Sequence, residues 1–218
     1  MRILLAVSLV ALASAVLGAP PAAPLPGFKP GIVRVKIVTS DGPMMLAIDT
    51  KRAPKTSANF LAYVDDGRFD GTSFYRAARG KKDPKTGFIQ GGIQTDARRI
   101  LPPFPLETTT MTGIRHLDAT VSMARAANPD SAGGNFVITI GPAPQMDARP
   151  GFAGYAAFGH LVAGRETVQR ILAEPSGGGL DAFKGQMILR KVKLISVRRL
   201  DGVAKPTGGP KVWLLMGQ

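Results

Sequence analysis

The chain contains no cysteine among its 218 residues, and it has only two histidines, His116 and His160. The lack of cysteine excludes a disulfide framework, a thiol nucleophile and a zinc site with cysteine ligands. Two histidines are too few for a histidine-rich metal centre. We therefore expect a protein that uses no metal and no other cofactor.

Acidic residues are also scarce, and the chain is strongly basic. Fifteen Asp and Glu stand against 28 Lys and Arg, which gives a formal net charge of +13 at pH 7. Such an excess is compatible with nucleic acid, with an anionic surface or with no specific partner. Hydrophobic residues make up 44% of the chain and charged residues 20%. This is ordinary globular composition, and it excludes a mostly disordered chain.

The first 18 residues have the pattern of a secretory signal peptide. Arg2 supplies a positive charge, an apolar run follows over residues 3–17, and small residues come next. The apolar run is shorter than the roughly 20 residues that a membrane-spanning helix needs. We expect cleavage after Gly18 or Ala15, export to the periplasm, and no transmembrane segment in the mature protein. An uncleaved N-terminal anchor is the alternative.

The remaining chain divides by composition. Residues 19–30 carry five prolines without periodicity, which predicts an extended linker. Residues 31–200 are the foldable region, long enough for one domain with its own core. Residues 201–218 read as a C-terminal tail with an apolar patch around Trp213.

Short apolar runs broken by Gly and Pro predict a mainly β fold. Alternation over 32–38 and 44–48, on either side of a turn, indicates a hairpin, and 187–197 reads as a long last strand. Helical spacing predicts a helix that opens at Ala53 and ends at Gly67, and a second one over 166–173. Further short strands are expected around 74, 88–89, 119–124, 135–140 and 155–162. Many short strands with two helices favour a barrel or a sandwich.

The motifs of common hydrolases and nucleotide-binding proteins are missing from the sequence. It has no Gly-x-Ser-x-Gly nucleophile turn, no phosphate loop and no zinc-type His-Glu pair. The glycine run at 177–179 lacks a following Lys and reads as a flexible turn. The sequence therefore shows no set of residues typical of acid–base hydrolysis.

Six segments occur in an order and spacing that resemble the cyclophilin family of peptidyl-prolyl cis–trans isomerases. They are 53–60 (APKTSANF), 71–76 (GTSFYR), 88–92 (FIQGG), 119–125 (ATVSMAR), 133–138 (GGNFVI) and 155–159 (YAAFG). Each segment alone is weak, but the series covers nearly the whole foldable region. The resemblance implies a closed antiparallel barrel of eight strands, capped by two helices.

The resemblance also implies a site. Arg76 matches the family's catalytic arginine, and Gln90 matches the residue that holds this arginine and the substrate carbonyl. The positions that match substrate-binding residues are Phe88, Ala124, Arg125, Asn135, Val137, Met146 and Tyr155. Ala124 and Arg125 would present backbone groups to the residue before the proline. Partners would be proline-containing polypeptides.

The chemistry of such a site follows from amide resonance. Rotation about an X–Pro bond meets a barrier of about 18–20 kcal/mol, so a catalyst must prefer the twisted amide over either planar isomer. In the twisted state the prolyl nitrogen regains a lone pair, to which a fixed guanidinium can donate. A dry pocket for the proline ring and polar groups for the flanking peptide complete the catalyst.

Several positions depart from the family pattern. The stretch 79–86 is longer and more basic than usual, Asn135 replaces a Gln, and Val137 replaces an aromatic residue. Because Gly87, Phe88 and Ile89 all precede Gln90, the sequence leaves open which of them faces the proline. The only Trp is Trp213 in the tail, which argues against tight binding of cyclosporin-type cyclic peptides. We expect activity, at a reduced level.

Two other functions compete with an exported isomerase that acts on X–Pro bonds and assists protein folding. One is a weak or inactive relative that serves as a peptide-binding or chaperone module. The other is nucleic-acid binding, which export disfavours and for which no interleaved aromatic and basic stripe is present. We expect a monomer that does not bind nucleic acid. The lysines Lys81, Lys82 and Lys85 of the insertion would form a basic rim near the pocket and attract acidic clients or an anionic surface.

Overall fold

The computed structural model describes residues 30–214 of the chain. The expected signal peptide, and all of the expected linker except Pro30, lie outside the described residues. The strands are β1 (Ile32–Thr39), β2 (Gly42–Asp49), β3 (Ser73–Arg79), β4 (Gly87–Gly92), β5 (Thr120–Met123), β6 (Asn135–Ile140), β7 (Ala157–Ala163), β8 (Ser176–Gly177) and β9 (Met187–Arg199). The α-helices are α1 (Pro54–Asp65), α2 (Thr109–Thr112) and α3 (Arg165–Ala173).

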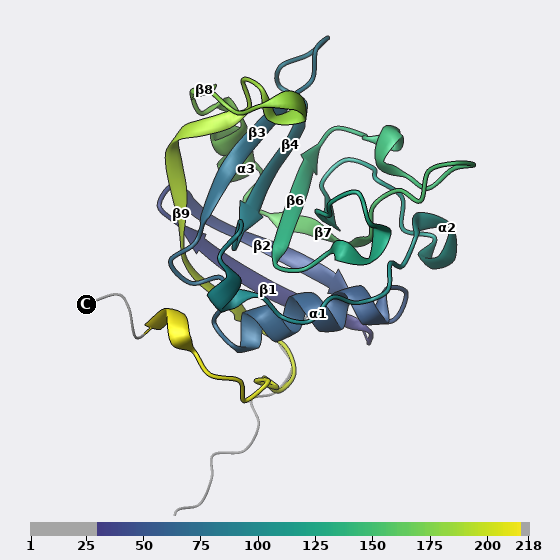
Figure 1. The fold of residues 1–218 in the computed structure, drawn as a ribbon, viewed down its shortest axis with the longest axis vertical. Coiled ribbons are helices and arrows are strands. Elements are labelled where there is room, and N and C mark those ends of the chain that lie inside the picture. The colour runs from purple at the N-terminus through teal and green to yellow at the C-terminus, as the bar shows by residue number, and fades with distance from the viewer. Residues whose placement is uncertain (1–29, 215–218) are drawn as a thin grey trace, which may run out of the picture.

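The strands close into an antiparallel barrel. Their order is β1-β2-β7-β5-β6-β4-β3-β9, and a pairing of β9 back onto β1 completes the ring. The two-residue strand β8 adds to the other edge of β9. Figure 1 shows β3, β4 and β6 side by side, which is the part of the wall that carries the site. The predicted eight-stranded closed barrel is confirmed.

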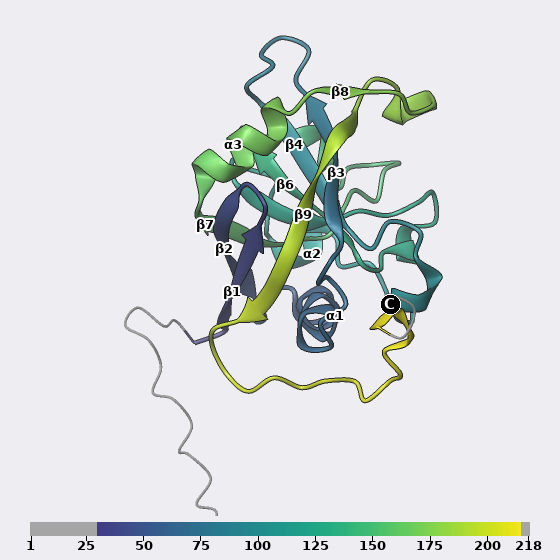
Figure 2. The same ribbon diagram turned by 90° about the vertical axis from the view of Figure 1, so that its left-hand side faces the viewer.

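Two helices cover the ends of the barrel, as predicted (Figure 2). From α1, Phe60 packs among three other buried rings, with centroids 5.1–5.4 Å away. At the other end, α3 buries Val168, Ile171 and Leu172. The third helix, α2, has only four residues and therefore no apolar periodicity by which the sequence could reveal it.

The first turn of α1 is stabilised by a distant carboxylate. Ala53, the residue before the helix, makes no side-chain cap. Instead the buried carboxylate of Glu107 accepts hydrogen bonds from the Thr56 amide at 2.7 Å and the Lys55 amide at 3.1 Å. A negative charge at this position satisfies free amides and interacts favourably with the helix dipole. This contact ties the long β4–β5 connection to α1.

The C-terminal segment packs against the barrel and α1. Asp201 accepts three hydrogen bonds from the Arg34 backbone and guanidinium, at 2.7–2.9 Å. Further along, the Trp213 ring is buried beneath two guanidinium groups, with Arg68 at 4.7 Å and Arg99 at 5.4 Å from its centroid. The segment crosses beneath α1 in Figure 2. A domain boundary at residue 200 remains a prediction, but the described part of the tail is a folded strap.

None of the helices between residues 30 and 214 has the length and apolar character that a membrane crossing requires.

Candidate active site

The period-two alternation of β4 decides which of its residues reach the outer face of the barrel. Phe88 and Gln90 lie on the outer side, facing a cavity, whereas Ile89 is fully buried in the core. Gly87 pairs with Arg79 at the start of the strand and does not line the cavity. The structure therefore places Phe88, of the three residues that the sequence left open, at the site.

A cavity of about 550 Å³ is lined by residues of β3, β4 and β6 and of the loops beside them. One side of it is a small apolar cluster that is separate from the barrel core: Val137, Ala143 and Met146, with Phe88, Ala124 and Tyr155 packed against them. Eight of the nine residues expected at the site line this cavity, namely Arg76, Phe88, Gln90, Ala124, Arg125, Val137, Met146 and Tyr155. An apolar concave surface of this kind suits a proline ring.

Arg76 lies at one side of the cavity, and its guanidinium is held at three points. Nη1 donates to Gln90 Oε1 at 2.9 Å, Nε donates to Gln186 Oε1 at 2.9 Å, and Nη2 donates to the Ala182 carbonyl at 3.2 Å. The Phe88 ring lies 5.0 Å from Cζ. Burial lowers the pKa of Arg76, but a guanidinium remains charged at neutral pH. The site thus presents a fixed cation beside an apolar wall.

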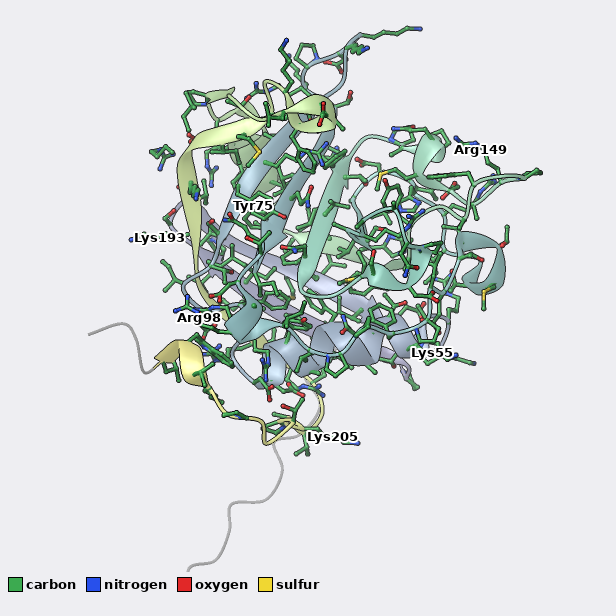
Figure 3. The ribbon with its side chains drawn as sticks, viewed as in Figure 1. Lys55, Tyr75, Arg98, Arg149, Lys193 and Lys205 are labelled. Atoms are coloured by element: carbon green, nitrogen blue, oxygen red, sulfur yellow. The ribbon has the colours of Figure 1, made fainter. Side chains whose placement is uncertain are left out.

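A hydrogen-bonded relay continues from Gln90 away from the cavity. Gln90 Nε2 donates to the Tyr75 hydroxyl at 2.8 Å, and this hydroxyl donates to Asn135 Oδ1 at 3.2 Å. Burial raises the pKa of Tyr75 to about 12, so the phenol stays protonated and can donate. Figure 3 labels Tyr75, which belongs to β3. The relay fixes the orientation of the Gln90 amide.

Asn135 is the one expected site residue that does not line the cavity. Its Oδ1 accepts from the Gln94 amide at 2.8 Å, and its Nδ2 donates to the Gln94 carbonyl at 2.9 Å. Gln94 has a φ of +55°, and the two bonds hold it in this left-handed conformation. The Asn135 side chain is shorter than the Gln of the family pattern, and it turns to the backbone. In the structure this side chain holds the Gln94 backbone and accepts from the Tyr75 hydroxyl, and its expected contact with substrate stays a prediction.

The rim opposite Arg76 combines arginines and aromatic rings. Arg125 donates through Nε to the Gly154 carbonyl at 2.9 Å, and its Cζ lies 5.0 Å from the Tyr155 ring. Arg149 stacks on Phe152 at 4.5 Å. Figure 3 shows Arg149 on the side of β6 away from Tyr75. Because Arg125 is tied to the loop, it shapes this rim and keeps Tyr155 in place.

Some residues of the site were not found from the sequence. Sequence patterns assign no role to Tyr75, although it lies within the 71–76 segment, and none to Phe152, Phe183 or Gln186. Gln186 lies 110 positions after Arg76 in the chain, so no local pattern connects them. Tyr75 is adjacent to Arg76 but faces the relay, and only the partners of its hydroxyl reveal this.

The basic insertion does not take part in the cavity. Residues 80–86 form the β3–β4 loop, which projects from the end of the barrel (Figure 1). Lys81, Lys82 and Lys85 are exposed, and none of them lines the cavity. Lys85 lines a separate hollow beside α3. The three lysines therefore do not form the expected basic rim of the cavity, and they lie on a loop that projects beside it.

A Ser–His–Asp set lies behind the cavity. His116 Nδ1 is 2.7 Å from Asp147 Oδ1, and its Nε2 is 2.9 Å from Ser122 Oγ. Ser122 is fully buried and His116 is 1% exposed, so no substrate reaches the hydroxyl. Asp147 also accepts from the His116 amide at 2.9 Å. The set fastens the turn that carries Met146, and it gives the site no nucleophile.

Within residues 30–214, no group of three or more His, Asp or Glu side chains is arranged to hold a metal ion. The charged groups that line the cavity are Arg76 and Arg125. The arrangement can bind a short extended peptide, hold a ring against an apolar wall and present guanidinium N–H groups to it.

Comparison with known proteins agrees with this geometry. Residues 34–198 match the family model described as cyclophilin type peptidyl-prolyl cis–trans isomerase/CLD. The chain is 34% identical to peptidyl-prolyl cis–trans isomerase A of Dickeya dadantii over 138 residues, which cover 63% of this chain and 70% of the relative. It is also 34% identical to the isomerase cyp18 of Streptomyces antibioticus over 168 residues, which cover 74% of this chain and 98% of the relative.

The fold is likewise found among solved structures. A cyclophilin type isomerase of Cryptosporidium parvum superposes with a TM-score of 0.62 at 23% identity, over 79% of this chain and 99% of that chain. The same isomerase was solved in the presence of the dipeptide Ala-Pro, and that structure superposes with a TM-score of 0.60 at 24% identity, over 78% of this chain and 99% of that chain. The motifs, the barrel and the family match agree, and the chain belongs to the cyclophilin family of peptidyl-prolyl cis–trans isomerases.

Proposed function

We propose that this chain catalyses cis–trans isomerisation of X–Pro bonds in exported polypeptides, with Arg76 as the catalytic residue. The observation that supports this most is the fixed guanidinium beside the apolar wall. A guanidinium has five N–H donors. Among the described residues three of them are engaged, which leaves one on each terminal nitrogen for a substrate. In the proposed mechanism, one of these free N–H groups donates to the prolyl nitrogen.

In the proposed mechanism no covalent bond is made or broken. The proline ring packs against Phe88, Val137 and Met146, and the X–Pro amide lies beside Arg76. As the amide twists, its nitrogen regains a lone pair and accepts a hydrogen bond from the guanidinium, which weakens the resonance that opposes rotation. A charge-assisted hydrogen bond of about 1.5–3 kcal/mol is worth about one to two decades of rate.

The other polar groups hold the flanking peptide. Gln90 has a second N–H on Nε2, which can donate to a substrate carbonyl. The Ala124 amide is committed to the Asn135 carbonyl at 2.9 Å. We assign the Ala124 carbonyl as the group that receives the amide of the residue before the proline. Holding the peptide on both sides restricts it to conformations close to the twisted state.

The relatives support the activity, and the composition of the pocket sets its expected level. Two bacterial relatives bear the name of the isomerase, and the C. parvum protein was solved in the presence of Ala-Pro. In this chain Val137 forms a wall where the family has an aromatic ring. A smaller wall contacts less of the proline ring, so we expect a lower turnover than that of relatives with the aromatic residue.

The direct test is an exchange measurement on a short X–Pro peptide by NMR, with Arg76→Ala beside the wild type. We expect the variant to lose at least nine tenths of kcat/KM. Arg98→Ala is the matched control, because Arg98 pairs with Asp96 and lies outside the cavity. Equal rates for Arg76→Ala and the wild type would show that the assigned mechanism is wrong. A wild type that binds the peptide and prevents aggregation without isomerising it would favour the chaperone alternative.

The proposal also includes export of the protein. It is supported by the pattern of residues 1–18 and by the proline-rich segment that separates them from the domain. The test is fractionation of cells that express the full chain, with mass spectrometry of the N-terminus. A mature chain that begins near residue 19 in the periplasmic fraction is expected. Intact residues 1–18 on protein from the cytoplasm would contradict export.

A further inference from the structure

The connection between β8 and β9 folds back over Arg76. This connection comprises residues 178–186. Its Ala182 carbonyl and its Gln186 side chain accept two of the three hydrogen bonds of the Arg76 guanidinium. The Phe183 ring lies 4.2 Å from Arg76 Cζ, closer than Phe88 at 5.0 Å. The guanidinium thus contacts two aromatic rings, one from β4 and one from this connection.

Phe183 belongs to the same cavity as the proline wall. Both Ala182 and Phe183 line it, and Phe183 is 41% exposed. A large apolar side chain left partly open at a binding cavity has surface to bury against a ligand. The exposed part of Phe183 is not needed to hold the barrel together, because the ring lies outside the barrel core.

The connection is held in place by its own turns. The Phe183 amide donates to the Leu180 carbonyl at 2.8 Å, and the Gln186 amide donates to the Phe183 carbonyl at 2.9 Å. Ser176 Oγ donates to the Gly185 carbonyl at 3.0 Å. Figure 1 shows this segment in yellow-green at the same end of the barrel as the β3–β4 loop. Phe183 is therefore presented by a short ordered turn, which lowers the entropic cost of using it in binding.

The strand order places Phe183 and the Ala124 rim at opposite ends of the cavity. Across the wall the strands run β9, β3, β4, β6, β5. Phe183 precedes β9 and lies on Arg76 of β3, whereas Ala124 follows β5. A peptide that crosses the cavity passes from one rim to the other. If the residue before the proline lies at Ala124, the residue after it lies at Phe183.

We propose that Phe183 is a specificity-determining residue that receives an apolar side chain directly after the proline, so that the preferred substrates are X–Pro segments followed by Leu, Phe or a similar residue. This inference rests on the proposed function and names its substrate class. The charged side chains that line the cavity are both arginines, Arg76 and Arg125. A basic residue after the proline is disfavoured there by like charge.

The test compares four peptides, Ala-Ala-Pro-Z with Z as Phe, Leu, Gly or Lys, by NMR exchange and by titration of peptide binding. In the wild type, kcat/KM for Phe and Leu should exceed that for Gly by about three- to tenfold, with Lys lowest. Phe183→Ala should lose most of this preference, with a smaller loss on the Gly peptide, and Phe183→Leu should retain most of it. Leu189→Ala is the matched control, since Leu189 is 70% exposed on β9 and outside the cavity.

The outcomes separate this inference from the proposed function. An equal loss on all four peptides would show that Phe183 only supports Arg76, and it would overturn the inference. The inference would also be overturned if Phe183→Ala changed the preference for the residue before the proline, measured with peptides that vary at that position. A wild type that isomerises no peptide but still binds Phe and Leu peptides more tightly through Phe183 would remove the proposed function and keep the specificity.

Discussion

Gln90 Oε1 accepts a hydrogen bond from Arg76 Nη1 at 2.9 Å, while the other end of the same amide donates to the Tyr75 hydroxyl at 2.8 Å. The amide therefore cannot turn over without breaking both contacts. Through it, the position of a guanidinium at the surface of the cavity depends on a buried phenol and on Asn135 behind it. Preorganisation of this kind is what electrostatic stabilisation of a transient charge distribution requires.

Arg76→Lys should lower kcat/KM by at least tenfold although the charge is retained. An ammonium cannot bridge Gln90, Gln186 and the Ala182 carbonyl in one plane, and it stacks less well on Phe183. Peptide exchange by NMR measures the effect. The matched control is Arg98→Lys, which should change kcat/KM by less than twofold. Retention of more than half of the activity in Arg76→Lys would show that charge alone suffices.

Tyr75→Phe should reduce kcat/KM several-fold, because Gln90 loses the partner that fixes its amide. The unfolding free energy should fall by about 1 kcal/mol for the lost hydrogen bond. Tyr63→Phe is a matched control: Tyr63 is also a buried tyrosine, its hydroxyl accepts from the Leu101 amide at 2.8 Å, and it does not line the cavity. It should lose similar stability and no activity. Equal kinetic effects in both variants would contradict the relay.

Trp213→Ala should destabilise the fold and leave turnover unchanged. Trp213 is 6% exposed, packs under Arg68 and Arg99, and does not line the cavity. Removing a buried Trp costs about 3–5 kcal/mol in a core, and we expect about 2 kcal/mol at this more peripheral position. Urea denaturation gives the value. Leu214→Ala, at a residue that is 63% exposed, should have little effect. A stable, unchanged Trp213→Ala protein would show that the strap contributes nothing.

Stability should fall as the pH is lowered from about 7 to 5. Burial lowers the pKa of His116, and the Asp147 carboxylate only partly opposes this. Burial and then Arg52 lower the pKa of His160. The unfolded chain binds protons at the ordinary histidine pKa of about 6.5, whereas the folded chain binds them only at lower pH. The contribution of the two neutral histidines to the unfolding free energy is therefore fully present above about pH 6.5 and declines below it.

The measurement is the unfolding free energy in urea as a function of pH. His116→Gln should flatten the slope between pH 7 and 5 more than His160→Gln does, whatever each variant loses in absolute stability. NMR titration of the imidazole gives an independent readout. A His116 ring that titrates at or above pH 6.5 in the folded protein would contradict the lowered pKa that burial gives this imidazole.

Replacing Lys81, Lys82 and Lys85 by Gln should leave turnover of a short neutral peptide unchanged, because none of them lines the cavity. Association with an acidic unfolded polypeptide should weaken several-fold at low salt and little at high salt. The control is Lys55→Gln, an exposed lysine on α1 at the other end of the barrel. Unchanged binding of the acidic chain by the triple variant would remove a role for this loop in attracting clients.

Much of the barrel was predictable because its signals are local. Alternation over 32–38 and 187–197 and the helical spacing in 53–67 appear in consecutive residues, and the structure has β1, β9 and α1 there. The extent of β9 was underestimated by two residues, because Arg198 and Arg199 break the alternation while still pairing with β1.

Sequence by itself determined the family, the barrel and most of the cavity, since short motifs bring their own strands and side chains with them. The tertiary structure decided what happens between distant segments. It placed Phe183 and Gln186 on Arg76, turned Asn135 to the Gln94 backbone, and laid Trp213 under two arginines. Each of these contacts joins residues that are tens to more than a hundred positions apart and depends on how single side chains are oriented. Contacts of this kind produce no periodic pattern in the sequence, so the sequence alone does not reveal them.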